Sequence, residues 1–131
     1  KLHSEILNID KLTYSGNIHN LSSIKSNYTF IESAISCKKT VSHLINKYKV
    51  GGLMFLQGGP LNQAKLTNYY QSISKTPLMI AIDAEWGVSM RLDSALRFPW
   101  QMTLGAIEDT TLIYDMGVEI ARQCKPGVSP N

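Results

Sequence analysis

The chain has 131 residues, of which 44% are hydrophobic and 18% are charged, and its formal net charge is +3. This composition is typical of an ordinary globular domain and excludes a disordered or coiled-coil chain. The basic residues are scattered without interleaved aromatic residues, and no apolar run approaches the ~20 residues that cross a bilayer. We therefore expect one domain, with neither nucleic acid nor a membrane as partner.

Residues 1–26 show no sustained hydrophobic period, because single Leu and Ile residues are scattered among Ser and Asn. We expect loop or poorly ordered chain there. Tyr28–Ile31 is a modest strand candidate, since it is rich in aromatic and β-branched residues. Residues 38–48 predict a helix with one apolar stripe. The stripe consists of Val41, Leu44, Ile45 and Tyr48.

Two short apolar runs, Leu53–Leu56 and Leu78–Ile82, predict strands buried on both faces. Between them, apolar residues recur at the spacing of an amphipathic helix. These residues are Leu66, Tyr69, Tyr70 and Ile73. Because strand–helix–strand crossovers join parallel strands, we expect the turns at Gln57–Pro60 and Asp83–Gly87 to lie on one rim of the sheet.

The second strand is followed directly by two carboxylates, Asp83 and Glu85, and then by Trp86 and Arg91. In parallel α/β folds, ligands bind at the carboxyl ends of the strands, so a functional carboxylate is expected at this place. The alternative, that Asp83 and Glu85 are ordinary loop residues, stays open on the residues alone.

Residues 110–124 predict the clearest helix, with Asp109 or Thr110 as its cap and Lys125 to Gly127 ending it. One broad apolar face is suited to packing on a sheet. It comprises Leu112, Ile113, Met116, Gly117, Ile120, Ala121 and Cys124. Before this helix, Phe98–Trp100 predicts a rigid turn, with Trp100 either packed or facing a ligand.

Cys37 and Cys124 are too few and too far apart for a disulfide framework or a zinc site, so we expect two free and largely buried thiols. The three histidines, His3, His19 and His43, stand far apart in the sequence without ligands at metal-binding spacing. We expect no metal and no cofactor.

Four segments in this order resemble one known family. They are KVGGLMFLQGGPLNQAKLTNYYQ from Lys49, PLMIAIDAEWGVSMRLDS from Pro77, FPWQMTLGAIED and MGVEIARQC ending at Cys124. This set resembles the N-terminal domain of glycoside hydrolase family 3, which contains β-N-acetylhexosaminidases and β-glucosidases. The resemblance implies an α/β fold, the N-terminal portion of a (β/α)8 TIM-type barrel, with two or three βα units and parallel strands. It divides the chain into a leader of uncertain assignment, residues 1–37, and a partial family 3 domain, residues 38–131.

The resemblance also implies roles for single residues. The aspartate that matches Asp83 hydrogen-bonds hydroxyls of the sugar at the cleavage site, and the arginine that matches Arg91 belongs to the same pocket. Trp86 is expected to supply an apolar face for the sugar, and Glu85 to organise the loop. The family's nucleophile and acid/base group lie downstream of the matched region, so we expect no catalytic residue in this chain. A full barrel takes about 250 residues, so the chain is expected to be the incomplete front part of one.

The leading hypothesis is therefore part of a retaining glycoside hydrolase that acts on terminal β-linked sugars, either β-N-acetylhexosaminides or β-glucosides. The expected partners are a small carbohydrate substrate and, to cover exposed edges, either the remainder of a parent chain or a second copy. A periplasmic or secreted location is favoured over a cytoplasmic one. Two alternatives stay open, a non-catalytic carbohydrate-binding or structural fragment and an unrelated α/β domain of flavodoxin-like order.

Overall fold

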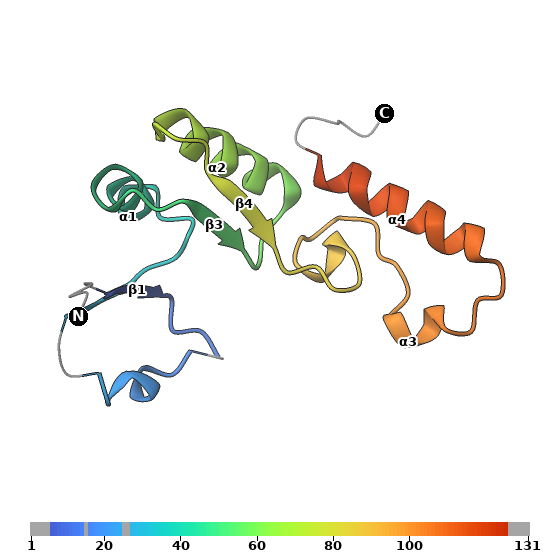
Figure 1. Ribbon diagram of the computed structural model, residues 1–131, viewed down its shortest axis with the longest axis horizontal. Helices are drawn as coiled ribbons and strands as arrows, with labels where there is room; N and C mark the ends of the chain where they lie inside the picture. Colours follow the sequence, from blue (N-terminus) through green and yellow to red (C-terminus); the bar gives the residue numbers. More distant parts are fainter. Residues whose placement is uncertain (1–5, 15, 25–26, 126–131) are drawn as a thin grey trace, which may run out of the picture. The chain divides into compact units, whose positions relative to one another are not determined.

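The computed structural model describes residues 6–14, 16–24 and 27–125 (Figure 1). The chain divides into two compact units, residues 1–43 and residues 44–131. Both units combine helices with parallel strands, so the fold is α/β. The strands form two parallel sheets of two strands each.

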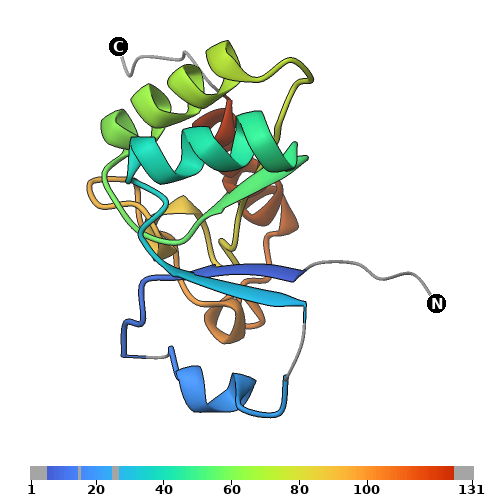
Figure 2. The ribbon, with the colours of Figure 1, turned by 90° about the vertical axis from the view of Figure 1, so that its left-hand side faces the viewer.

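The first unit is built on the pairing of two strands, which run side by side in Figure 2. Its elements are β1 (Ile6–Asp10), η1 (Ile18–Leu21), β2 (Tyr28–Glu32) and α1 (Lys38–His43). The parallel register runs from Ile6 opposite Tyr28 to Asp10 opposite Glu32.

The predicted strand at Tyr28–Ile31 is confirmed, whereas the prediction of loop for residues 1–26 is wrong at β1 and η1. β1 is a short strand with Asn8 at its centre, and its partner β2 follows only after a long connection. Its extended state is therefore stabilised by backbone pairing, which a local hydrophobic period does not report. Residues 1–5, 15 and 25–26 lie outside the described part of the chain.

The predicted helix over residues 38–48 is confirmed, although it changes type part-way. α1 is followed directly by η2 (Leu44–Tyr48), a π-helical turn that belongs to the second unit. Val41, Leu44 and Ile45 are buried, as the predicted stripe requires.

The second unit carries the predicted strand–helix–strand. Its further elements are β3 (Gly52–Phe55), α2 (Pro60–Ile73), β4 (Met79–Ile82), η3 (Val88–Met90), α3 (Gln101–Leu104) and α4 (Thr110–Cys124). β3 and β4 pair in parallel, with Leu53 opposite Ile80 and Phe55 opposite Ile82. The predicted strands, their order and their direction are confirmed.

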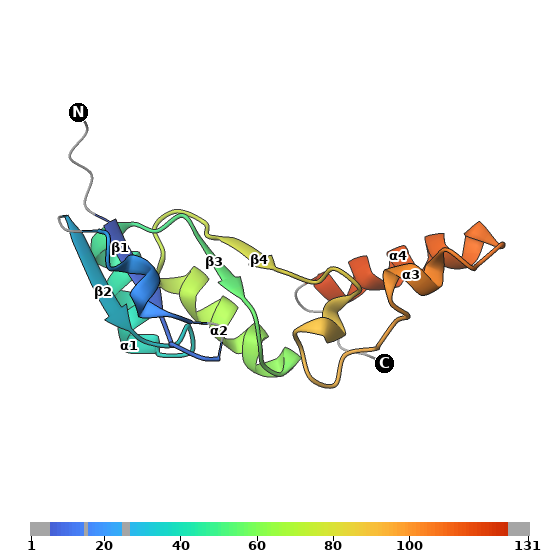
Figure 3. The same ribbon diagram turned by 90° about the horizontal axis from the view of Figure 1, so that it is seen from below.

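α2 lies along the β3–β4 sheet (Figures 1 and 3). Pro60 occupies its first turn, where no backbone N–H is needed, and Leu66 and Tyr70 are buried from its inner face. The Gln71 side-chain amide accepts a hydrogen bond from Leu78 N at 2.9 Å and donates one to Leu78 O at 2.8 Å. These two bonds tie the end of the helix to the start of β4.

The expectation that both faces of these strands are buried is wrong. Phe55 is 1% exposed on the inner face, but Met54 and Met79 are 54% and 76% exposed. The side chains of a strand alternate between its faces, and α2 covers only one face of this two-stranded sheet.

α4 begins as predicted, with the Asp109 carboxylate accepting hydrogen bonds from Thr111 N at 2.9 Å and Thr111 Oγ1 at 2.6 Å. Its apolar face is only partly covered. Ile113, Met116 and Ile120 are half-buried, while Leu112 is 57% exposed. Within the described residues, no helix combines the length and the apolar character that a membrane span requires.

Candidate functional site

Asp83 and Arg91 form an ion pair at the carboxyl end of β4. The Arg91 guanidinium donates to Asp83 in two ways, from Nε to the backbone carbonyl oxygen at 2.7 Å and from Nη2 to the side-chain atom Oδ2. The Arg91 side chain is 24% exposed and the Asp83 side chain 42%. Because guanidinium and carboxylate are joined by a planar, directional contact, the two groups hold each other in one orientation.

The chain between the two residues has to turn back on itself to make this contact. Gly87 has a φ of 110°, a region that favours glycine, and its N–H donates to Ala84 O at 3.2 Å. η3 follows immediately and places Arg91 beside the end of the strand. A Cβ atom at Gly87 would lie 3.2 Å from Cδ2 of Phe98, so the turn is also packed closely.

The turn after β3 meets the segment that follows Arg91. Gly58, at a φ of 137°, forms a parallel bridge with Leu92, and its carbonyl oxygen accepts a hydrogen bond from Asp93 N at 2.9 Å. The prediction that the Gln57–Pro60 and Asp83–Gly87 turns share one rim is therefore confirmed. The functional roles of Asp83, Arg91 and Trp86 remain predictions.

Trp86 lies in the same loop and stacks on Trp100, with ring centroids 6.2 Å apart and an interplanar angle of 25°. The Arg97 guanidinium lies over the Trp86 ring, 5.6 Å from its centroid. Gln101 Nε2 donates to the backbone carbonyl oxygen of Glu85. This bond ties the Trp86 loop to the start of α3, and because it uses only the backbone of Glu85, the loop-organising role of the Glu85 side chain stays a prediction.

The pair leaves polar atoms available to a ligand. Arg91 occupies Oδ2 of Asp83, and within the described residues no hydrogen bond reaches Oδ1. A carboxylate oxygen with free lone pairs accepts hydroxyl protons, and a guanidinium supplies donors in a fixed fork. This combination of an acceptor and donors is chemically suited to vicinal hydroxyl groups.

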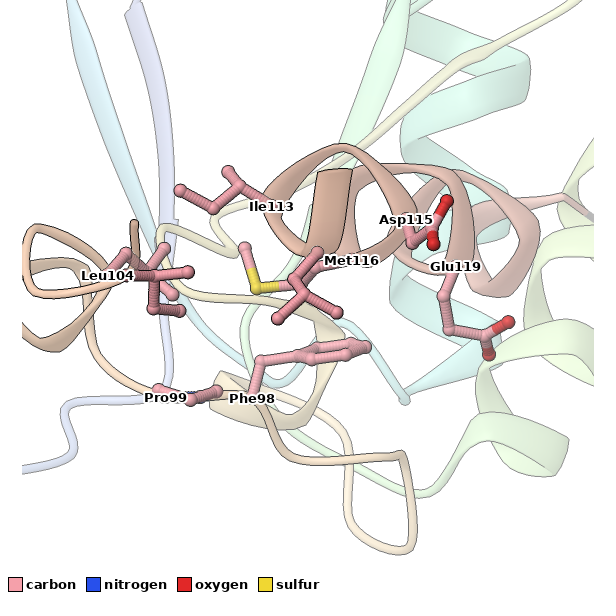
Figure 4. Close-up of a pocket in the computed structure, with 9 residues that line it drawn as sticks. Phe98, Pro99, Leu104, Ile113, Asp115, Met116 and Glu119 are labelled. Atoms are coloured by element: carbon pink, nitrogen blue, oxygen red, sulfur yellow. The ribbon is translucent and has the colours of Figure 1, made fainter. Parts of the chain in front are cut away.

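A separate hollow of about 340 Å³ lies between the 98–99 turn, α3 and α4 (Figure 4). Its walls are almost wholly apolar, including Phe98, Leu104 and Met116. The carboxyl groups of Asp115 and Glu119 point away from Leu104 in Figure 4.

Glu119 is already engaged by its own helix. Hydrogen bonds from Arg122, at 2.7 Å to each carboxylate oxygen, and from Gln123 lower the pKa of Glu119 to about 2. The hollow offers a sugar almost no free polar group, so it is no candidate for the sugar site.

Cys37 and Cys124 are free, as predicted, but both are exposed, so the expectation of buried thiols is wrong. Cys37 directly precedes α1, where its sulfur accepts a hydrogen bond from Thr40 Oγ1 at 3.3 Å. Ser33 Oγ donates in turn to Thr40 Oγ1 at 3.0 Å. The hydrogen bond from the Thr40 hydroxyl is the largest contribution that lowers the pKa of Cys37 to about 7.

Across residues 6–14, 16–24 and 27–125, no three or more His, Cys, Asp and Glu side chains are grouped so as to hold a metal ion.

A comparison with protein-family models matches residues 13–126 to the glycosyl hydrolase family 3 N terminal domain. The chain belongs to glycosyl hydrolase family 3. The match begins well before Lys49, where the motif resemblance starts, and it decides against the unrelated α/β domain of flavodoxin-like order. A comparison with curated proteins gave no match. By family, the protein is a glycoside hydrolase.

Arg97 and Gln101, two residues that contact the loop of this family 3 domain in which Trp86 lies, were not singled out from the sequence. Trp100 was left open between packing and ligand contact. The signal was present in the pattern Arg97-Phe-Pro-Trp100-Gln101, where a cation, an aromatic residue and an amide surround a rigid turn. Only the structure shows that this turn lies against the Trp86 loop.

Proposed function

We propose that the chain is part of a retaining glycoside hydrolase that acts on terminal β-linked sugars, β-N-acetylhexosaminides or β-glucosides. Asp83 and Arg91 bind hydroxyl groups of the terminal sugar, and Trp86 supplies an apolar surface. The observation that carries this proposal is the Asp83–Arg91 pair at the carboxyl end of a parallel strand, where Oδ1 of Asp83 accepts no hydrogen bond from any residue that the structure describes.

The same geometry supports a binding role for Asp83 rather than a role as nucleophile. A retaining mechanism needs a nucleophilic carboxylate and an acid/base group about 5 Å apart across the glycosidic bond. Asp83 is held by Arg91 at both its backbone and its side chain, and the nearest carboxylate in sequence, Glu85, is exposed in a loop. We therefore propose that neither residue performs the covalent step and that this step needs groups outside the chain.

A second proposal concerns the fold and its partners. The two parallel strand pairs of this family 3 domain are part of a (β/α)8 barrel whose further strands and helices cover apolar surface. Met54, Met79 and Leu112 are each more than half exposed, which supports a covering partner, either more of a parent chain or a second copy. Sedimentation of the purified chain over a range of concentrations tests for the second copy. If a Met79→Lys variant associates as strongly as the unmodified chain, the exposed surface around Met79 is not where a second copy binds.

The alternative function is that of a non-catalytic carbohydrate-binding protein. The specific observation in its favour is that Asp83 and Arg91 are already paired and oriented in this chain. A parent protein that binds β-glycosides through Asp83 and hydrolyses none of them would support this alternative.

Binding and turnover of β-glycosides by the purified chain test the main proposal. We expect methyl β-N-acetylglucosaminide or methyl β-glucoside to bind with roughly millimolar affinity, which corresponds to about 4 kcal/mol. Asp83→Ala should weaken this binding about tenfold or more, because a hydrogen bond to a charged group contributes about 1.5 to 3 kcal/mol.

The matched control is Asp115→Ala on α4, which removes an exposed carboxylate outside the loop and should leave binding unchanged. Chromogenic β-glycosides should not be hydrolysed by the chain. Robust turnover that Asp83→Asn abolishes would overturn the binding role assigned to Asp83.

A further inference from the structure

Trp86 and Trp100 present an aromatic surface that a terminal sugar held by Asp83 does not fully use. The two indoles are stacked, and Trp100 is 58% exposed. Trp100 therefore keeps much of its ring surface accessible beside Trp86, and ligand sites combine aromatic surfaces with a few polar groups. These rings are the only two tryptophans in the chain.

Two polar contacts hold this surface in place. Gln101 Nε2 donates to the carbonyl oxygen of Glu85, next to Trp86, and Gln101 itself directly follows Trp100. One amide therefore ties together the two segments that carry the indoles. Arg97 adds a cation, with its guanidinium over the Trp86 ring. Among the described residues no carboxylate forms an ion pair with Arg97, so its N–H donors are available to a ligand.

We propose that Trp100 and Arg97, together with Trp86, which also borders the pocket of the terminal sugar, form a second sugar subsite that binds the ring next to the terminal sugar. This inference rests on the proposed function, because it takes the terminal sugar to be held by Asp83. A terminal β-linked sugar has its neighbour only on the leaving-group side of the glycosidic bond, so the second ring is the one released by cleavage. Trp86 follows Asp83 by three residues in the same loop, so the two subsites share one loop.

The chemistry of the three side chains matches a pyranose. A pyranose ring presents C–H groups on its faces and hydroxyl groups around its rim. A flat indole suits the face, and guanidinium donors suit the rim. We therefore expect Trp100 and Arg97 to set the preference for the released part of the substrate. Asp83 and Arg91 should set the preference for the terminal sugar.

The test compares one ring with two. The probes are methyl β-glucoside against methyl β-cellobioside, and methyl β-N-acetylglucosaminide against the methyl β-glycoside of chitobiose. NMR titration of the 131-residue chain measures the affinities, and tryptophan fluorescence reports directly on the proposed subsite because both fluorophores belong to it. In the series that binds, the disaccharide should bind about tenfold more tightly than the monosaccharide, since it covers part of an indole face. The monosaccharide should shift the emission through Trp86 alone, and the disaccharide should shift it further because it also covers Trp100.

Variants separate this subsite from the pocket at Asp83. Trp100→Ala should remove most of the tenfold gain and leave the affinity for the monosaccharide within about twofold. Trp100→Phe should retain part of the gain, which guards against a loss caused by misfolding. Gln101→Ala, a change in a positioning residue, should also lower disaccharide affinity alone. Tyr114→Ala removes an aromatic side chain that is 74% exposed on α4 and should change neither affinity.

The outcomes are distinguishable. A disaccharide that binds no more tightly than its monosaccharide, or a gain that survives Trp100→Ala, overturns the second subsite and leaves the proposed function standing. If neither sugar of either series binds, the proposed function fails together with the subsite. If the disaccharide binds through Trp100 while Asp83→Ala changes nothing, the platform is supported and the role given to Asp83 is wrong.

Discussion

Removing the charges of Asp83 and Arg91, singly and together, measures how much their interaction contributes to the free energy of unfolding. Asp83→Asn removes the charge but leaves the hydrogen bond from Arg91 Nε to the Asp83 carbonyl oxygen, whereas Arg91→Gln removes both contacts. With 24% and 42% exposure the pair is partly screened by solvent, so its coupling belongs near the upper end of exposed pairs, about 1 kcal/mol. We expect destabilisation of about 1 kcal/mol for Asp83→Asn and about 2 kcal/mol for Arg91→Gln.

The double variant should then be no less stable than Arg91→Gln alone, because the coupling is lost only once. Urea unfolding followed by circular dichroism measures all four proteins, and the coupling should shrink in 1 M salt. The matched control is the same set of variants at Glu119 and Arg122, an ion pair within one turn of α4 and outside the Asp83 loop. Effects of Asp83→Asn and Arg91→Gln that add up independently would refute the inference that these two residues form one unit.

Three further predictions follow from single residues. Gly87→Ala should destabilise the chain by about 1 to 3 kcal/mol, because its φ of 110° and the Phe98 ring oppose a side chain, while Gly117→Ala in α4 should be neutral or stabilising in the same thermal unfolding assay. Because the pKa of Cys37 is lowered to about 7, its alkylation by iodoacetamide should rise with a midpoint near pH 7, and Thr40→Val should move that midpoint upward; an unmoved midpoint would contradict the assigned cause. In a longer protein that carries this domain and hydrolyses β-glycosides, Asp83→Ala should lower kcat/KM roughly ten- to a few hundredfold without rescue by azide, since a glycosyl azide product would identify Asp83 as the nucleophile.

Elements with a strong local pattern could be predicted from the sequence. α2 and α4 have apolar residues at helical spacing, with Pro60 starting α2 and the Asp109 cap starting α4, and β3 and β4 are short apolar runs that end in turns. The shared rim, where Gly58 pairs with Leu92, followed from the parallel direction of strands that a crossover helix joins. Asp83 and Arg91 were found because a carboxylate follows a buried strand and an arginine recurs at the family spacing.

Features that depend on distant pairing could not be predicted in this way. β1 has little local hydrophobic period and becomes a strand by pairing with β2. Burial of Cys37 and Cys124 was inferred from the average behaviour of cysteine, whereas exposure depends on which elements cover each position. The stack of Trp86 on Trp100 joins two loops, and no periodicity in either loop reports it.

The most direct test of the central claim is a crystal structure of the chain with a bound methyl β-glycoside. The proposed function predicts hydroxyl groups of the sugar within hydrogen-bond distance of Asp83 Oδ1 and of the Arg91 guanidinium, with the ion pair between the two side chains intact. A sugar bound elsewhere, with the Asp83 carboxylate making no contact to it, would contradict the assignment of this rim as the sugar site.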